Sequence, residues 1–161
     1  MAENNLKIRT ISWPAVAVQV IILAFLIKLL SWMGLSNPFP FLVGPPFYLF
    51  IAFGLRGWLE EDHRKGMKAI RSQNYHAALE YFDQSIEFFE NYPKVDKYRA
   101  LTLLSAARFS FREMGMVNKA YCLGQVGRVS EMAALYRQVF QEYPENDIAR
   151  MALELMDLKE E

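Results

Sequence analysis

The first third of the chain is almost purely apolar, whereas polar and apolar residues are mixed at helical spacing in the remainder. Residues 13 to 32 read WPAVAVQVIILAFLIKLLSW, a run of 20 residues. As an α-helix this run is about 30 Å long, which matches the hydrocarbon core of a bilayer. Trp13 and Trp32 stand at its two ends, and tryptophan is typical of the headgroup interface. We therefore predict a transmembrane helix near residues 13–33, preceded by a polar segment at 1–12.

Lys28 is the one charged residue of this run and lies one turn before Trp32. We expect its side chain to reach the interface along the helix. The alternative is that Lys28 forms an ion pair inside the membrane. A cleaved signal peptide is not expected, because the run is too long for a signal core and no small-residue cleavage pattern follows it.

A second apolar segment, NPFPFLVGPPFYLFIAFGLRGW, occupies residues 37–58. Prolines at positions 38, 40, 45 and 46 each remove a backbone donor, so we expect a regular helix to begin only near Pro46. We place a second span near 39–57, with Pro45 and Pro46 inside it and Arg56 at its end. Three arrangements stay open: a span completed by an extended proline-rich stretch, a short helix whose arginine reaches the interface, and a re-entrant element covered by protein.

The charged residues are distributed as unevenly as the apolar ones. Of the 18 basic and 18 acidic residues, four precede position 56, namely Glu3, Lys7, Arg9 and Lys28. Basic residues flank the two apolar segments on their outer sides, and the connector at 31–46 carries no charge. Because cytoplasmic flanks of membrane helices are enriched in lysine and arginine, this distribution predicts a helical hairpin with both termini cytoplasmic. A formal net charge of +0 offers no attraction for nucleic acid.

The region after residue 58 carries the composition and spacing of helices. Glycine, asparagine and proline divide it into about six segments, which we expect to be helical near 58–72, 75–91, 95–111, 113–126, 128–143 and 146–158. Connections this short make neighbouring helices antiparallel. The prediction is therefore an all-α protein, with a transmembrane hairpin at 13–57 and a cytoplasmic helical domain at 58–161.

Two parts of this region repeat one residue pattern. Each has an apolar stripe at spacings of three and four residues, which begins after a tight turn. Before each stripe lies another helix, with a small residue twelve positions before the second member of the stripe. The helix that carries the stripe is followed by a tyrosine–proline pair. In chain order the first set is Gly66, Tyr75, Ala78, Phe82 and Pro93, and the second is Ala120, Val129, Met132, Tyr136 and Pro144. We expect the small residues to let two helices approach and the aromatic residues to pack between them.

This pattern resembles the tetratricopeptide repeat (TPR), a helix–turn–helix unit of about 34 residues. The resemblance covers residues 58–93 and 113–146, and it implies a TPR-like antiparallel array of helical hairpins. Two departures are that Met132 stands where the family usually has alanine, and that Ala78 and Met132 are 54 positions apart. An additional helix near 95–111 is expected to separate the units. The alternative is a plain helical bundle, in which all buried helices share such a stripe.

The resemblance also implies a partner. TPR-like proteins bind other proteins in a groove lined by the first helix of each hairpin. The groove positions carried over to this chain flank the small residues, and they are His63, Met67 and Ile70 around Gly66, and Val117, Tyr121 and Gly124 around Ala120.

Few residues of the chain have the type and spacing of a catalytic or metal site. Glu60 and His63 have the E-x-x-H spacing of di-iron bundles, but such a site needs a second pair. Two histidines and one cysteine make no zinc pattern, and no phosphate loop or nucleophile motif occurs. Cys122 is expected to be a small buried hydrophobe. We therefore expect no enzymatic activity, no metal site and no cofactor.

Two functions of different classes remain. The first is a membrane-anchored scaffold, adaptor or assembly factor that docks a protein partner, such as a membrane protein or complex, at the membrane surface. The second is a permanent small accessory subunit of a larger integral membrane complex. The repeat-like groove favours the first, and the proline-rich segment favours the second, since irregular backbone at membrane depth needs protein around it.

Overall fold

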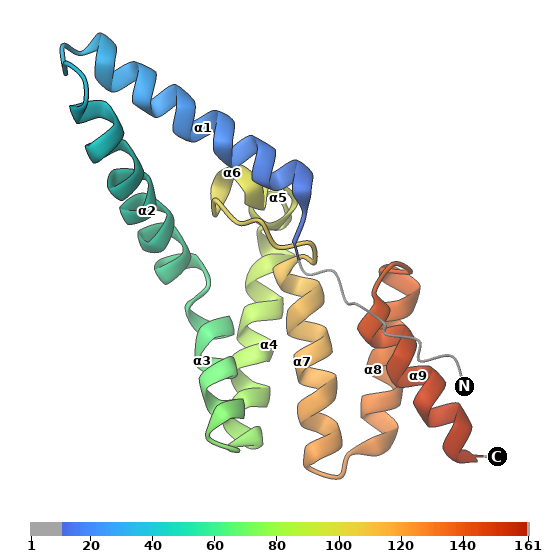
Figure 1. The fold of residues 1–161 in the computed structure, drawn as a ribbon. Helices are drawn as coiled ribbons and strands as arrows, with labels where there is room; N and C mark the ends of the chain where they lie inside the picture. Colours follow the sequence, from blue (N-terminus) through green and yellow to red (C-terminus); the bar gives the residue numbers. More distant parts are fainter. Residues whose placement is uncertain (1–10, 161) are drawn as a thin grey trace, which may run out of the picture. The chain divides into compact units, whose positions relative to one another are not determined.

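The computed structural model describes residues 11 to 160, and within that range the protein is all-α and contains no strand. The all-α prediction is therefore confirmed for this part of the chain. The helices in chain order are α1 (Trp13–Trp32), α2 (Phe39–Leu59), α3 (Glu61–Arg71), α4 (Tyr75–Asn91), α5 (Pro93–Lys97), α6 (Arg99–Thr102), α7 (Phe111–Gln125), α8 (Val129–Glu142) and α9 (Asp147–Glu160) (Figure 1). The side chains at positions 56, 58, 59 and 158–160 lie outside the description, as do residues 1–10 of the polar segment predicted at 1–12.

The described residues divide into two compact units. One, here called the apolar unit, consists of residues 11–61 and 93–108. The other, here called the helical unit, consists of residues 62–92 and 109–160. The segment at 93–108 thus belongs with the first two helices, although it lies between α4 and α7 in the sequence.

Helix α1 has the bounds expected from the apolar run, and none of its residues is buried. It begins with Pro14 in the first turn, where no hydrogen bond requires the missing backbone N–H. By length and composition α1 is able to cross a membrane. Trp13 and Trp32 are exposed at its ends, and Lys28 is exposed near its last turn.

Helix α2 begins at Phe39, seven residues earlier than the expected start at Pro46. That expectation is wrong because Pro40 falls in the first turn, where it costs no bond, and because the helix continues through Pro45 and Pro46. The residue before Pro45 is Gly44, whose missing Cβ removes part of the clash that a proline imposes on its predecessor. Gly44 also contacts α1, since a Cβ there would lie 3.0 Å from Ile27 Cγ1. The second membrane span, and Arg56 at its end, stay predictions; the Arg56 side chain lies outside the described part.

The single helix expected at 95–111 is wrong. Two short helices, α5 and α6, are followed by irregular backbone in which Leu104 has a φ of 47°. Arg99 folds this backbone back: its Nε and Nη2 donate to the carbonyl oxygens of Ala107 and Arg108 at 3.0 and 2.5 Å. Helix α7 then begins afresh at Phe111, behind its own N-cap residue Ser110.

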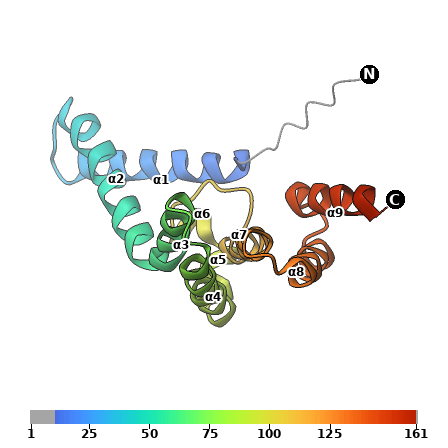
Figure 2. The same ribbon diagram turned by 90° about the horizontal axis from the view of Figure 1, so that it is seen from below.

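The helical unit is a row of antiparallel helices. Helix α7 packs on α4 and on α8, and α8 packs on α9. Figure 2 shows α3, α7 and α9 along one side of this unit and α4 and α8 along the other. The row therefore presents two different faces, one made by alternate helices α3, α7 and α9.

Equivalent residues of the two repeated stretches are buried in both. A Cβ at Gly66 would lie 2.8 Å from the ring of Phe82, so only glycine lets α3 approach α4 this closely. Ala120 and Tyr136, each 54 positions later, lie in one buried cluster with Val139. Gly66 thus lies directly against an aromatic residue of the next helix, and Ala120 is buried in the same cluster as the equivalent aromatic residue.

Candidate partner-binding groove

A hollow of about 250 Å³ lies on the face of the helical unit made by α3, α7 and α9. Its lining is almost wholly apolar. The lining residues are His63, Met67, Phe109, Met114, Val117, Asn118, Asn146 and Ile148. This set is called the α3/α7/α9 groove below. A hollow of this size and character accepts an apolar side chain of a partner, with a few polar groups to orient it.

Helical periodicity places these side chains together. His63 and Met67 are four residues apart on α3, and Met114, Val117 and Asn118 follow the same rule on α7, so each set lies on one helix face. Tyr121 continues the α7 face by one further turn and is 41% exposed. Its ring meets the ring of Tyr75 edge-on, with centroids 6.2 Å apart.

The groove has a rigid floor at His63. This residue is buried, and its imidazole contacts the rings of Phe82 and Phe111 edge-on, at centroid distances of 5.5 and 5.7 Å. Beside it, Asn118 Nδ2 lies 3.4 Å from the sulfur of Met67, which joins α7 to α3. Aromatic contacts of this kind hold the imidazole of His63 in place.

A buried polar pair fixes the end of the groove where α7 and α9 begin. Asn146 is almost completely buried, and its Nδ2 donates to Glu113 Oε1 at 2.8 Å. Its Oδ1 accepts from the backbone N–H of Ala149 at 2.8 Å, which caps α9. Glu113 Oε2 in turn accepts from the N–H of Ser110, whose hydroxyl accepts from the N–H of Glu113, both at 3.1 Å. The two helix starts are therefore held together by mutually satisfied caps.

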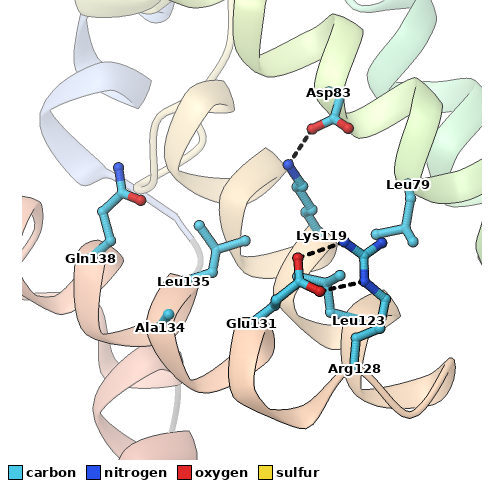
Figure 3. Close-up of a pocket in the computed structure, with 9 residues that line it drawn as sticks. All are labelled: Leu79, Asp83, Lys119, Leu123, Arg128, Glu131, Ala134, Leu135 and Gln138. Atoms are coloured by element: carbon cyan, nitrogen blue, oxygen red, sulfur yellow. Dashed lines mark hydrogen bonds and ion pairs between the residues drawn. The ribbon is translucent and has the colours of Figure 1, made fainter.

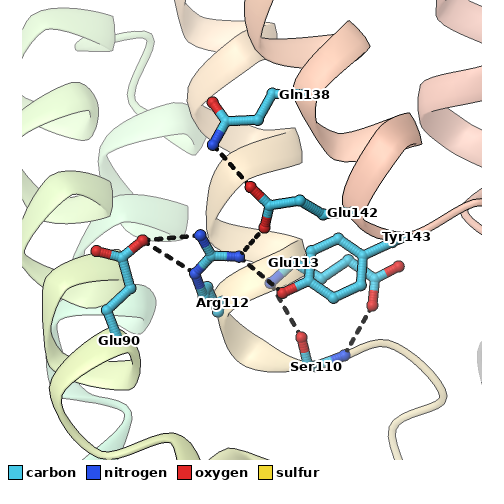
Figure 4. A network of polar contacts seen from close by, with 7 residues as sticks. All are labelled: Glu90, Ser110, Arg112, Glu113, Gln138, Glu142 and Tyr143. Atoms are coloured by element: carbon cyan, nitrogen blue, oxygen red, sulfur yellow. Dashed lines mark hydrogen bonds and ion pairs between the residues drawn. The ribbon is translucent and has the colours of Figure 1, made fainter.

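Arg112 ties together three helices on the other side of α7 (Figure 4). Its Nε and Nη2 donate to Glu90 Oε1 of α4 at 3.0 and 2.8 Å, and its Nη1 donates to Glu142 of α8 and to the hydroxyl of Tyr143. Partial burial lowers the pKa of Arg112, but the bonds to Glu142, Tyr143 and Glu90 raise it above its ordinary value. The hydrogen bond from Arg112 lowers the pKa of the Glu142 carboxyl group. This cluster orients α4, α7 and α8, and so supports the groove without lining it.

A second hollow, of about 330 Å³, lies between α4, α7 and α8 (Figure 3). Ion pairs occupy its walls: Lys119 pairs with Asp83, and Arg128 Nε and Nη2 donate to Glu131 at 2.7 and 2.5 Å. These charges pair with one another inside the hollow. It therefore offers less apolar surface to a partner than the α3/α7/α9 groove does.

The groove residues carried over from the TPR resemblance divide into two sets. His63, Met67 and Val117 line the hollow, and Tyr121 extends its face. Ile70 instead packs against the buried cluster around Ala78, and Gly124 faces Met132, whose sulfur would lie 2.6 Å from a Cβ at that position. Gly124 is thus the close-approach residue of the α7–α8 crossing.

The residues expected to pack between repeats lie mostly in two buried clusters. Tyr75, Ala78, Phe82 and Met132 belong to the first cluster or pack against it. Ala120 and Tyr136 belong to the second, against which Met132 also packs. Pro93 starts α5 and Pro144 lies in the turn before α9, so each follows a helix whose C-cap residue is a tyrosine.

The described residues contain no group of three histidine, cysteine or acidic side chains placed to hold a metal ion. Cys122 is completely buried, and burial raises the pKa of its thiol to about 11. Its thiolate is therefore scarce at neutral pH, and the thiol is a poor nucleophile.

Comparison with protein-family models, with curated proteins and with solved structures finds no match to this chain.

Proposed function

We propose that this chain is a membrane-anchored interaction protein, acting as a scaffold, adaptor or assembly factor. In this account α1 holds it in a bilayer, and a TPR-like helical unit docks a protein partner at the membrane surface. The observation that carries the proposal is the apolar α3/α7/α9 groove. An exposed apolar hollow of this kind suits the binding of a partner's apolar side chain.

The repeated burial of equivalent positions supports the TPR-like interpretation. Gly66 against Phe82 and Ala120 with Tyr136 occupy corresponding positions 54 residues apart. The groove is lined by the first helix of each hairpin, α3 and α7, together with α9. That is the surface to which the resemblance assigns partner binding.

The charge distribution supports a particular topology. In our proposal α1 and α2 form a transmembrane hairpin, and both termini and the helical unit are cytoplasmic. Arg64, Lys65, Lys68 and Arg71 lie on α3, directly after α2 in the chain. A basic cluster at this place is typical of a cytoplasmic flank.

Binding energy in such a site comes from a few buried anchors. Partner side chains that pack against Met67, Val117 and Tyr121 contribute a binding free energy of roughly 25 cal/mol per Å² of apolar surface buried. The exposed charges of the rim contribute little, because solvent screens them. Attachment to the membrane raises the effective concentration of the groove for neighbouring membrane proteins.

Replacing Tyr121 with alanine is expected to weaken partner capture without lowering the abundance of the protein. Tyr121 is 41% exposed, so its removal costs mainly the edge-on contact with Tyr75, about 0.5–1.5 kcal/mol, and it deletes the aromatic part of the docking face. The measurement is the amount of copurified partner per tagged protein from native membranes, and a loss of at least tenfold is expected.

Phe140→Ala is the matched control for this variant. Phe140 is an exposed aromatic of similar size on α8, and it does not line the groove. Equal capture by the Tyr121→Ala variant and the parent protein, or an equal loss in the Phe140→Ala variant, contradicts docking at the groove.

A permanent accessory subunit of a membrane complex is the second candidate, and α2 favours it. Pro45 and Pro46 cannot donate to the carbonyl oxygens of Phe41 and Leu42 four residues before them. Phe50 and Phe53 are among its large exposed apolar side chains. Such a surface suits packing against other membrane helices. Size analysis in mild detergent separates the two candidates: a subunit elutes wholly with one large assembly, and an adaptor leaves a free pool.

A further inference from the structure

We propose that the segment at 93–108, which contains α5 and α6, is a membrane-interface element that binds anionic phospholipid headgroups beside the start of α1. The inference rests on the proposed insertion of α1 in a bilayer. It goes beyond protein docking, because it assigns a lipid-binding role to a segment outside the groove.

Backbone contacts tie this segment to the first residues of α1. The N–H of Ser12 donates to the carbonyl oxygen of Ala106 at 2.9 Å, and Ile11 forms an antiparallel bridge with Ala107. Helix α6 packs against α1, as Figure 1 shows. Since Trp13 marks the interfacial end of α1, the segment lies at the same depth as the headgroups.

Internal bonds make the segment a rigid element. Arg99 Nη1 donates to the carbonyl oxygen of Asp96 at 3.2 Å, in addition to its bonds to Ala107 and Arg108. The hydroxyl of Thr102 donates to the carbonyl oxygen of Val95 at 2.6 Å. The bonds to Val95 and Asp96 satisfy carbonyls of α5, and those to Ala107 and Arg108 satisfy carbonyls of irregular backbone, as is required near hydrocarbon.

The exposed side chains have the composition of a membrane interface. Tyr98 and Leu101 are 50% and 56% exposed, and Trp13 is exposed at the start of α1. The Nζ of Lys97 lies 5.6 Å from the centre of the Tyr98 ring. Aromatic and aliphatic residues beside lysine are typical of elements that lie in the plane of the interface.

Charge complementarity selects anionic lipid. The segment reads PKVDKYRALTLLSAAR, and Asp96 is its one acidic residue. Asp96 is 5% exposed, whereas Lys94 and Lys97 are exposed. The outward charge of the segment is therefore positive, and lysines near a bilayer are attracted to anionic headgroups.

The test uses the full chain in vesicles of phosphatidylcholine and phosphatidylserine. Fluorophores are attached at Leu101→Cys or, separately, at Phe25→Cys, which is an exposed position in the middle of α1. The native Cys122 is buried and does not compete for the label. Lipids spin-labelled at the headgroup or at the chain centre then report depth by quenching. Circular dichroism checks that each labelled protein keeps its helix content.

We expect the Leu101 label to be quenched at least twofold more by headgroup spin labels than by chain-centre labels, and the Phe25 label to show the reverse. Quenching of the Leu101 label by neither lipid, with the Phe25 label still quenched, overturns this inference and leaves the insertion of α1 intact. A Phe25 label quenched by neither lipid overturns the insertion itself, and this inference with it.

Neutralising the two lysines tests the headgroup chemistry. Lys94→Gln with Lys97→Gln is expected to lower the headgroup quenching of the Leu101 label at least twofold in these vesicles, but not in vesicles of phosphatidylcholine alone. The matched control is Lys68→Gln with Arg71→Gln, which removes the same charge from exposed positions of α3. An equal effect of both pairs overturns the assignment to residues 93–108.

Discussion

Tryptophan in place of Ala78 is expected to destabilise the helical unit strongly. Ala78 is completely buried in a cluster formed by α3, α4 and α7, where it packs with Ala69, Phe82 and Leu123. A glycine is already required opposite Phe82 for α3 and α4 to approach, so this crossing has no room for an indole. Overpacking a core typically costs about 1–3 kcal/mol and occasionally more, out of a domain stability of about 5–15 kcal/mol.

The measurement is thermal unfolding of the full chain in detergent, followed by circular dichroism. We expect a loss of the cooperative transition or a fall in the melting temperature of at least 10 °C, since about 1 kcal/mol corresponds to a shift of roughly 4–8 °C in a domain of this size. His76→Trp is the control, because His76 is exposed on the same helix. Identical melting of the Ala78→Trp variant and the parent contradicts the packing of α3, α4 and α7 described above.

Two aspartates in α1, Ile21→Asp with Phe25→Asp, are expected to abolish stable membrane insertion. Both positions are exposed near the middle of the helix. An aspartate at a helix centre costs about 2.5–3.5 kcal/mol on insertion, so the pair costs roughly 5–7 kcal/mol. The fraction of protein that stays with membranes after alkaline extraction is expected to fall from nearly all to a minor part.

Ile21→Val with Phe25→Leu is the control, since it keeps both positions apolar, and it is expected to extract like the parent. A reporter fused after Glu161 follows the topology in the same cells, and the parent and the control are expected to place it in the cytoplasm. Full membrane retention of the double aspartate variant contradicts the role of α1, and an extracytoplasmic reporter contradicts the hairpin.

Local patterns predicted those helices whose signals agree with one another. Helix α4 has the bounds expected from its apolar stripe, with Asn74 before it and Pro93 after it. Its cap is formed by Asn74 Oδ1, which accepts from the N–H of Ala77 at 3.2 Å. Helix α1 also has the expected bounds, because a run of 20 mostly apolar residues leaves little choice of conformation.

The two failures arose where local rules conflicted with tertiary contacts. Pro45 and Pro46 predicted that no helix would form before residue 46, but the packing of Gly44 against Ile27 favours a continuous α2. In the segment at 95–111, helix-forming residues predicted one helix, but Arg99 bonds to carbonyl oxygens eight and nine residues later and folds the chain back instead. A signal for the true start of α7 was present as Ser110-x-x-Glu113, the capping-box pattern.

The groove was predictable only in part. Positions flanking the small residues identified His63, Met67 and Val117, because helical spacing decides which residues share a face. Asn146 and Glu113 were missed, since their bond joins positions 33 residues apart and depends on how α7 meets α9. Ile148 was missed for a related reason, because α9 lies outside both repeated stretches.

Site-directed photocrosslinking in native membranes tests the central claim most directly. A photoreactive residue at Met67, inside the groove, is compared with one at Gln141, which is exposed on α8 and does not line the groove. The account predicts one discrete protein adduct from position 67 that is lost when Tyr121 is also replaced with alanine, and no such adduct from position 141. No adduct from position 67, or the same adduct from both positions, contradicts a membrane-anchored groove that docks a protein partner.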